Sequence, residues 1–485
     1  MEIFKNLVAE RVFHYFFEIS KIPRESKNEK AIREYLKKFA QENNLDYYQD
    51  KIGNLIIKKE ASKNFENSNG IILQGHLDMV CEKSEDSNHN FKTDPLDLII
   101  EDNFIKAKGT TLGADNGIAI AMAMAILENK ELRHPNIEFL ATIEEETSMK
   151  GAMNLEKNIL KGKYLINLDA KEEDVITVAS AGALIIENSV KIEKEKINKG
   201  NYKFFNISIS NLLGGHSGRE IHKKRGNAYK ILLDIISKLR EEFEINLIDI
   251  KGSSKVNVIP KESSIDFTIL KQDESKFLKK VKDIFFNYKK LLEIEKNVEF
   301  KVKEIEVSDE IIPKRYFNDL LKLSQKLPNG VNTFMKNYPE IVESSSNFAA
   351  IKIENNKIKL IVSIRSSNKE EEDKLAKKIY ELANNYSYCS EILVHFPAWE
   401  YMENSKIRDT SLKTYEQLFD KKMKIAIVHT GLECGALKKN YPNLEIISLG
   451  PDIYDIHSVK ERLDITSTER TYTFLLELLK NLKDF

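Results

Sequence analysis

The sequence predicts an α/β protein in which one α/β domain is interrupted by a long α+β insert. Short apolar strands alternate with helices up to about residue 186. From about residue 187 to 398 the strands are longer and alternate between apolar and polar residues, and α/β character returns in residues 399–485. Because alternating strands and helices build α/β layers, we predict a domain formed by residues 1–186 and 399–485, with residues 187–398 inserted as a second domain.

Composition excludes several classes of protein. A chain of 485 residues is expected to form two or three domains. Its net charge of −1, from 75 Lys and Arg against 76 Asp and Glu, provides no field that would attract nucleic acid. Three cysteines are too few for a disulfide framework or a cysteine-based zinc site. The opening residues lack a secretory signal, and no apolar run approaches the roughly 20 residues of a membrane helix, so we expect a cytoplasmic protein.

The first 186 residues supply most elements of the α/β domain. The apolar spacing predicts an N-terminal helix that ends before Pro23. Ser26 and Glu29 have the spacing of a capping box and predict a helix over residues 29–42. An all-apolar run at residues 119–127 predicts a buried helix. Strands are expected at residues 54–58, 71–73, 104–108, 136–143 and 163–168.

The insert shows a weak internal duplication. Each half fits a split α/β sandwich, with boundaries at about residues 187–310 and 311–398. The first half has predicted helices at 226–243 and 274–292, with strands at 204–210, 256–259, 264–270 and 298–307. The second half has predicted helices at 316–327 and 369–385, with strands at 346–348, 359–364 and 391–396. Asn257 and Asn347 occupy matching positions in the two halves.

The last 87 or so residues return to the first domain. They contain predicted strands at 424–428 and 445–449, a helix near 411–419 and a C-terminal helix.

Histidine and acidic residues follow several of the predicted strands. The strand at residues 71–73 leads into His76 and Asp78, whose spacing of two points both side chains the same way in extended backbone. Asp115 lies in a glycine-rich turn that opens a helix, and Glu144, Glu145 and Glu146 follow the strand at 136–143. Asp169 and His457 each follow a strand as well. Taken singly, such residues are more often helix caps, solvated faces or hydrogen-bonded histidines.

Their joint placement favours a metal site. All five positions lie beyond strand or turn ends of one inferred sheet, where ligands of α/β proteins bind. Two histidines and three carboxylates suit zinc, manganese or cobalt. Two such ions, bridged by a carboxylate and a water, polarise a carbonyl group and activate a nucleophile.

Motifs along the whole chain resemble the M20 metallopeptidases and, within them, the cytosolic aminoacyl-histidine dipeptidases. They comprise ISKIPRESKNEKAIREYL, HLDMVCE, GTTLGADNG, EEETSMKGA, LINLD, GGHSG, LPNGV, SIRSS, GLECG and GPDIYDIHS. The resemblance implies a mixed-sheet catalytic domain that holds two metal ions and is interrupted by a lid domain of two related units.

The resemblance also implies roles in the metal centre. Asp115 would bridge two divalent ions, most readily Zn, with Mn or Co as alternatives. His76 and Asp169 would complete one ion, and Glu146 and His457 the other. Glu145 would be the general base that takes a proton from the water between the ions. Asp78 would orient His76, and the peptide bond from Asp115 to Asn116 is expected to be cis.

The predicted lid acquires substrate-binding roles by the same resemblance. His216 would stabilise the oxyanion of the tetrahedral intermediate. Arg365 would bind the free α-carboxylate of the substrate, although a surface ion pair is the alternative. Asn257 would contact the substrate, and Glu433 would meet its α-amino group.

Some positions depart from the family pattern. Ala170 and Lys171 stand where relatives carry a serine and an acid, and Thr147 and Ser148 replace a small residue and a glycine. Glu144 adds a third acid before the catalytic pair; the register rests on the MKGA segment that follows.

The resulting hypothesis is a metal-dependent dipeptidase for Xaa-His, carnosine-like or broader dipeptides. The alternatives are an N-acyl-amino-acid amidohydrolase of the same superfamily and an inactive peptide-binding homologue. The expected partner is a dipeptide, with neither nucleic acid nor membrane, and the chain is expected to be a monomer or a homodimer. The duplicated insert would allow one chain to complete its own active site, which makes dimerisation optional.

Overall fold

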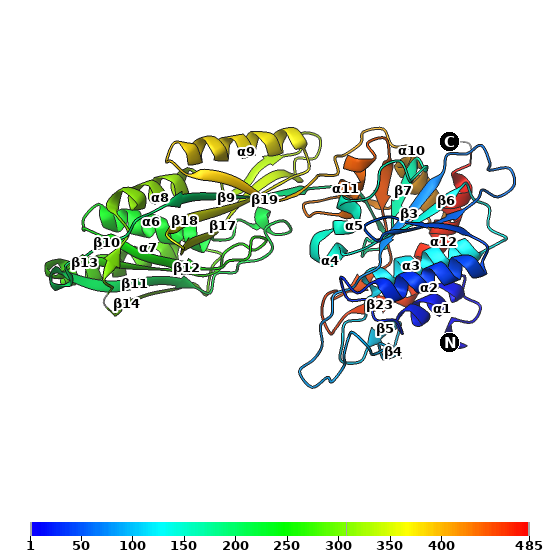
Figure 1. Cartoon of the computed structure of the whole chain (residues 1–485), viewed down its shortest axis with the longest axis horizontal. Coiled ribbons are helices and arrows are strands. Elements are labelled where there is room, and N and C mark those ends of the chain that lie inside the picture. The colour runs from blue at the N-terminus through cyan, green and yellow to red at the C-terminus, as the bar shows by residue number, and fades with distance from the viewer. Residues whose placement is uncertain (1, 307, 484–485) are drawn as a thin grey trace. The chain divides into compact units, whose positions relative to one another are not determined.

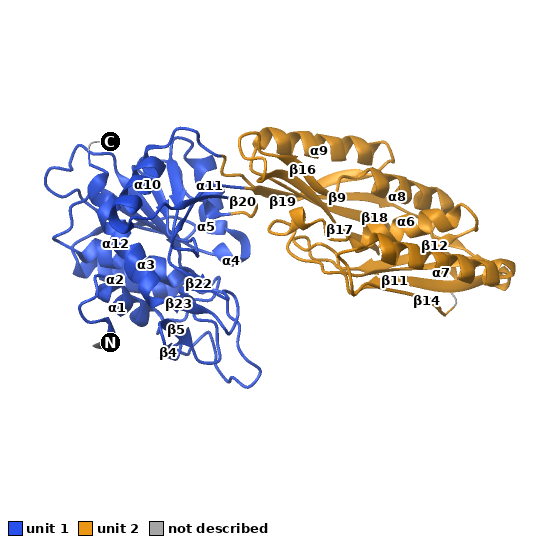
Figure 2. Cartoon of the chain, turned by 180° about the vertical axis from the view of Figure 1, so that it is seen from behind, with its two compact units in different colours: residues 1–180, 401–427, 432–485 blue, residues 181–400, 428–431 orange. Residues whose placement is uncertain are grey.

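The computed structural model describes residues 2–306 and 308–483. The chain forms two compact units (Figure 2). Unit 1 comprises Met1–Ser180, Tyr401–Ile427 and Leu432–Phe485, and unit 2 comprises Ala181–Glu400 and Val428–Gly431. Within the described residues no helix combines the length and the apolar composition needed to cross a membrane.

Unit 1 is built on an eight-stranded mixed sheet (Figure 1). Its strands, in spatial order, are β1 (Asp46–Gln49), β2 (Leu55–Lys59), β6 (Ile137–Thr142), β3 (Ile71–His76), β7 (Tyr164–Asn167), β21 (Glu445–Ser448), β8 (Val175–Ser180) and β20 (Lys424–Val428). The four central strands β6, β3, β7 and β21 are parallel. Their carboxyl ends therefore share one edge, the position where α/β sheets bind ligands. β1 and β2 extend the sheet in the antiparallel sense.

Helices cover this sheet and complete the core. They are α1 (Glu10–Ile19), α2 (Lys30–Glu42), α3 (Ala114–Glu128), α4 (Glu145–Ser148), α5 (Lys150–Met153), α10 (Lys406–Phe419), α11 (Glu433–Asn440) and α12 (Ile465–Asn481). Every residue of α3 from Ala114 to Leu127 is buried, which confirms the predicted buried helix. A second sheet of β22 (Ile453–Tyr454), β23 (Arg462–Asp464), β5 (Phe104–Ala107) and β4 (Leu98–Glu101) joins the C-terminal segment to the segment before α3.

The predicted capping box at the start of α2 is wrong. Glu29 occupies the N-cap position, and no side chain caps the helix. The Ser26 hydroxyl instead donates a hydrogen bond to Asp78 Oδ2 at 2.7 Å, and Glu29 Oε1 accepts the N–H groups of Lys27 and Glu144. Ser26 and Glu29 therefore bind groups other than the two backbone N–H groups that a capping box pairs.

Unit 2 contains two α/β sandwiches, and the sheet of the second has one more strand than that of the first. The first has the sheet β12-β13-β11-β14, built from β11 (Tyr202–Ser210), β12 (Asn246–Gly252), β13 (Ser263–Leu270) and β14 (Glu299–Glu304) with α6 (Ala228–Arg240) and α7 (Glu274–Leu291). The second has the sheet β16-β17-β18-β9-β19, built from β9 (Gly182–Lys191), β16 (Gly330–Phe334), β17 (Val342–Glu354), β18 (Lys357–Ser366) and β19 (Cys389–Phe396) with α8 (Lys314–Lys326) and α9 (Lys369–Asn384). Two short strands, β10 (Glu195–Lys196) and β15 (Glu310–Ile311), pair with each other in the antiparallel sense.

The second sandwich is discontinuous in sequence. Strand β9 pairs with β18 on one side and β19 on the other, yet it precedes the whole first sandwich in the chain. The second half predicted from the sequence, residues 311–398, therefore lacks this strand. One hydrophobic core, which includes Phe267 of the first sandwich and Phe348 of the second, spans both sheets.

Two expectations within the insert are wrong. Residues 256–259 form only an isolated bridge between Val258 and His216, and the strand beside β13 is β12. Asn257 therefore lies in a loop, whereas Asn347 lies in β17. The side chain of Asn347 donates to the carbonyl of Val258 at 2.9 Å, so the two positions are linked but not equivalent. The predicted strand at 298–307 corresponds to β14, and residue 307 lies outside the described residues.

Candidate metal centre and active site

The candidate residues of unit 1 gather at the carboxyl edge of the parallel strands. β3 ends at His76, which is paired in register with Thr142 at the end of β6. Helix α4 follows β6 and begins at Glu145, and Asp169 lies two residues beyond β7. Gly75 allows α3 to approach β3 closely, because a Cβ at this position would lie 2.5 Å from Asn116 Oδ1.

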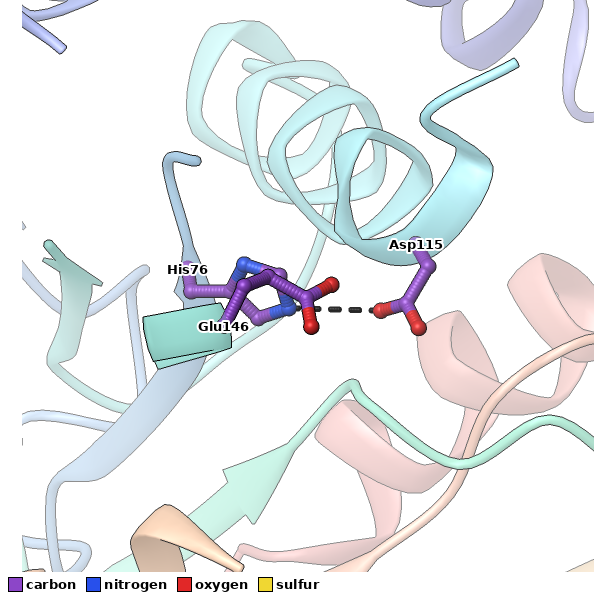
Figure 3. A group of neighbouring side chains, drawn as sticks. All are labelled: His76, Asp115 and Glu146. Carbon is purple, nitrogen blue, oxygen red and sulfur yellow. Dashed lines mark hydrogen bonds and ion pairs between the residues drawn. The ribbon is translucent and has the colours of Figure 1, made fainter. Parts of the chain in front are cut away.

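Asp115 lies at the centre of this group. Its Oδ1 is 3.2 Å from His76 Nε2, and its Oδ2 is 3.3 Å from His457 Nε2. His457 Nε2 is also 3.1 Å from Glu146 Oε1. Figure 3 shows the side chains of His76, Asp115 and Glu146 directed at a common point, and one ligand atom from each lies within 4.8 Å of the others. The two oxygens of one carboxylate thus face two different histidines.

The His76 side of the centre contains a second carboxylate and a cation. Asp169 Oδ1 is 3.6 Å from His76 Nε2. The ammonium group of Lys171 lies 2.5 Å from the same Asp169 oxygen and 2.9 Å from Asp115 Oδ1. These oxygens therefore already accept a positive group, and two imidazoles with three carboxylates form a donor set that fits divalent ions.

Glu145 and Glu146 point into this centre, whereas Glu144 does not. Glu145 Oε2 is 3.9 Å from His76 Nε2. Burial, together with the neighbouring carboxylates, raises the pKa of Glu145 well above its ordinary value. Glu144, in left-handed backbone with φ of 52°, forms an ion pair with Lys150 at 3.0 Å. The structure thus separates the three consecutive acids into one outside the centre and two inside it.

Asp78 connects His76 to the Glu145–Glu146 pair. It lies 3.4 Å from His76 Nδ1, and its two oxygens accept the backbone N–H groups of Glu145 at 3.0 Å and Glu146 at 3.2 Å. Burial alone would raise the pKa of Asp78, but its hydrogen bonds with His76, Ser26 and Glu145 outweigh burial and lower it. Asp78 is therefore an ionised acceptor that fixes three chain segments around the centre.

The turn that carries Asp115 is held by Asn116 and by two charged residues that sequence analysis did not single out. The Asp115–Asn116 peptide bond is cis, as expected. Asn116 accepts the N–H of His76 and donates to the carbonyl of Leu168, which joins the ends of β3 and β7. Arg24 and Glu461 contact the same turn and are almost completely buried. In a sequence with many charged residues, no local pattern distinguishes these two from surface residues, so only the structure identifies them.

Glu433 lies beneath the centre, at the start of α11. Its Oε2 accepts hydrogen bonds from Gln74 Nε2 and Thr142 Oγ1, both at 2.7 Å. Its Oε1 is buried and has no hydrogen-bond partner among the described residues. Burial raises the pKa of Glu433 to about 7. One oxygen of a buried acid is thus left for a further donor.

In unit 2, His216 is held as one defined tautomer. The backbone N–H groups of Gly218 and Arg219 donate to His216 Nδ1 at 3.0 and 3.1 Å. Nδ1 is therefore unprotonated, and the proton of the neutral ring is on Nε2. Burial, together with nearby Arg365 and Arg219, lowers the pKa of His216 to about 4. His216 presents a neutral N–H donor at physiological pH.

Arg365, in β18, is a buried arginine without an ion-pair partner among the described residues. Its Nε is 3.5 Å from Ser217 Oγ, and burial lowers its pKa to about 10.

A Cβ at Gly218 would lie 2.3 Å from the His429 carbonyl oxygen, 3.1 Å from His216 Cε1 and 3.2 Å from Arg365 Nε. These three residues therefore converge on one glycine. His429, which sequence analysis did not single out, forms a 2.7 Å hydrogen bond with Ser345. Asn257 is exposed, and its carbonyl accepts the N–H of Ser217 at 2.8 Å.

Comparison with known proteins finds similarity over the whole chain. Residues 72–481 match the model of peptidase family M20/M25/M40. The cytosol non-specific dipeptidase of Escherichia coli (strain K12) is 33% identical over 484 residues, which are 99% of each chain. The crystal structure of aminoacylhistidine dipeptidase from Vibrio alginolyticus superposes with a TM-score of 0.90 at 31% identity and covers 99% of each chain. Aminopeptidase PepT from Bacillus cereus shares the fold, with a TM-score of 0.57 at 15% identity over 98% of this chain and 99% of its own.

Proposed function

The chain belongs to peptidase family M20/M25/M40, and on this premise we propose that it is a dinuclear metallopeptidase that hydrolyses dipeptides. The observation that carries the proposal is the Asp115 carboxylate, one oxygen of which faces His76 and the other His457. A carboxylate divided between two histidines in this way is suited to bridging two ions. The Escherichia coli relative, at 33% identity, and the Vibrio alginolyticus structure, at 31% identity, are both named as dipeptidases.

The contacts of the candidate residues support two proposed ligand sets. His76, Asp115 and Asp169 would hold one ion, and Asp115, Glu146 and His457 the other. Mixed imidazole and carboxylate donors favour zinc, with manganese or cobalt as alternatives. When bound, two such cations polarise the scissile carbonyl and lower the pKa of a nearby water.

Glu145 is the proposed general base. Its carboxylate accepts a proton from the attacking water and delivers it to the amide nitrogen that leaves. Asp78 keeps Glu145 in place through the Glu145 N–H group.

The substrate contacts are proposed from the chemistry of each side chain. Arg365, a buried guanidinium with no acidic partner among the described residues, would bind the α-carboxylate. The Nε2–H of His216 would donate to the oxyanion. The free oxygen of Glu433 would accept the α-amino group, and Asn257 would contact the peptide. An α-amine site favours dipeptides over N-acyl amino acids, with Xaa-His and carnosine-like dipeptides as candidates.

We further propose a cytoplasmic enzyme, because the relative from Escherichia coli is named as a cytosolic protein. Residues 187–398 are proposed as its lid, which acts in a monomer or a homodimer. Neither nucleic acid nor a membrane is a proposed partner.

The test combines metal analysis with a substrate panel. Zinc-loaded protein is expected to hydrolyse Ala-His faster than N-acetyl-histidine, and Glu145→Gln is expected to retain its metal and lose nearly all turnover. Preference for the acetylated compound would instead identify an amidohydrolase. Absence of hydrolysis in both proteins would identify a peptide-binding homologue.

A further inference from the structure

Glu461 binds the turn that carries Asp115 through both of its carboxylate oxygens. Oε2 accepts the backbone N–H groups of Leu112 at 2.9 Å and Gly113 at 3.0 Å, and Oε1 accepts the N–H of Asp115 at 3.2 Å. The side chain is 3% exposed. Three donors on one buried carboxylate form a strong, charge-assisted attachment.

Arg24 binds the same turn from its carbonyl side. Its Nη2 donates to the carbonyl of Gly113, and its Nη1 donates to the carbonyls of Leu77 and Asp78, both at 3.1 Å. Gly113 has a φ of 66°, and a Cβ at this residue would lie 2.5 Å from Arg24 Nη2. The N–H of Gly113 is thus bound to a buried anion and its carbonyl to a buried cation.

These contacts join the segments that carry three proposed ligands. Glu461 lies four residues after His457 and is bound to the N–H of Asp115. Arg24 connects the Asp115 turn to the residues that directly follow His76. We propose that Glu461 and Arg24 are a pair of positioning residues that hold Asp115 midway between His76 and His457. This proposal rests on the metal centre proposed above.

The chemistry of the Glu461 side chain makes the proposal specific. Glutamine in its place has one acceptor oxygen, so its amide N–H₂ would face either the Asp115 N–H or the N–H groups of Leu112 and Gly113. A buried donor left without a partner is destabilising. The relaxation that relieves this contact moves the Asp115 backbone, and with it the two oxygens that face the histidines.

Glu138 provides a matched control in the same unit. Its Oε2 accepts the backbone N–H groups of Lys161 at 2.7 Å and Gly162 at 2.8 Å, and the residue is 5% exposed. It lies near the start of β6, at the end of the sheet opposite to the metal centre. Glu138→Gln therefore removes a comparable carboxylate without acting on the ligands.

The experiment measures zinc dissociation constants of the full-length protein by competition with a chromophoric chelator, and kcat and KM at saturating zinc. For Glu461→Gln we expect zinc binding to weaken about 10–100-fold, as for other residues that orient metal ligands, with kcat reduced and KM little changed. Glu138→Gln is expected to lower the melting temperature but to bind zinc like the wild type. Glu461→Asp, which keeps the charge but is one methylene shorter, serves if Glu461→Gln does not fold.

Two results would overturn the proposal: wild-type zinc affinity in the folded Glu461 variant, or an equal loss of affinity in Glu138→Gln. A wild-type protein that binds no zinc would contradict the proposed metal centre itself. Arg24→Lys provides a second test, because one ammonium group does not reproduce the guanidinium's three contacts. It is expected to weaken zinc binding as well, and unchanged affinity would remove Arg24 from the pair.

Discussion

Substitution of Asp78 by asparagine tests whether this residue positions Glu145, the proposed base, and Glu146, a proposed metal ligand. In the wild type its two oxygens accept the N–H groups of Glu145 and Glu146, and Oδ2 also accepts the Ser26 hydroxyl. Asparagine retains a single acceptor oxygen. Whichever way the amide is turned, its N–H₂ group faces the N–H of either Glu145 or Glu146.

The size of the effect follows from this unpaired donor. A buried donor without a partner costs about 1–3 kcal/mol, and each 1.36 kcal/mol of barrier corresponds to tenfold in rate. If most of this cost falls on the placement of Glu145 and Glu146, kcat falls about 10–100-fold. KM is expected to change little, since Asp78 is not a proposed substrate contact.

The assay is steady-state hydrolysis of a dipeptide at saturating zinc, with the metal content of each variant measured in parallel. Ser26→Ala is the control, because it removes one hydrogen bond from Asp78 Oδ2 and leaves both backbone donors paired. We expect Ser26→Ala to retain most of its kcat. A D78N protein with full metal content and a kcat within twofold of the wild type would refute the reasoning.

Three further predictions concern other parts of the two units. Gly218→Ala should raise KM at least tenfold while circular dichroism stays unchanged, because the new Cβ meets His429, His216 and Arg365; an unchanged KM would show that this glycine does not shape a binding site. Arg365→Lys should raise KM about 10–100-fold with a smaller change in kcat, because an ammonium lacks the guanidinium's bidentate geometry. An equal rise in KM for the methyl ester of the substrate would contradict carboxylate binding. Glu433 has a folded-state pKa raised to about 7 by burial, so the folded protein binds this proton more tightly than the unfolded chain. The free energy of unfolding of chelator-treated wild type should therefore fall as pH rises from about 4.5 to 7, by at most about 3 kcal/mol. Thermal melts of Glu433→Gln should lack this decline, and parallel pH profiles of the two proteins would show that the carboxyl does not titrate in this range.

The sequence predicts the parallel strands and the candidate ligands that follow them, because both depend on short stretches of chain. Residues 71–73 are continuously apolar, and His76 lies where an extended path from them must lead. Patterns that depend on distant partners mislead. Ser26 has the spacing of a helix cap, but its hydroxyl is bonded to Asp78, 52 residues away. Arg24 and Glu461 resemble surface charges in the sequence, since nothing local shows that Gly113 lies between them.

The sequence also does not predict the order of the strands in the sheets of unit 2. The apolar alternation of residues 204–210 and 359–364 identifies strands of the insert, and the duplication indicates two sandwiches. Pairing partners are set by contacts across the folded unit, so the placement of β9 between β18 and β19 has no local signal.

The position of β21 has a consequence for biosynthesis. This strand lies between β7 and β8 in the sheet of unit 1, yet it is made more than 260 residues after β8. While the ribosome is still producing the intervening chain, β7 has one unpaired edge, and β8 lacks both of its neighbours in the sheet, β21 and β20. Open edges and late, long-range pairing slow folding and promote aggregation. The edge of β7 and both edges of β8 therefore stay open until the last part of the chain emerges, which makes these two strands the expected contact sites for a chaperone during synthesis.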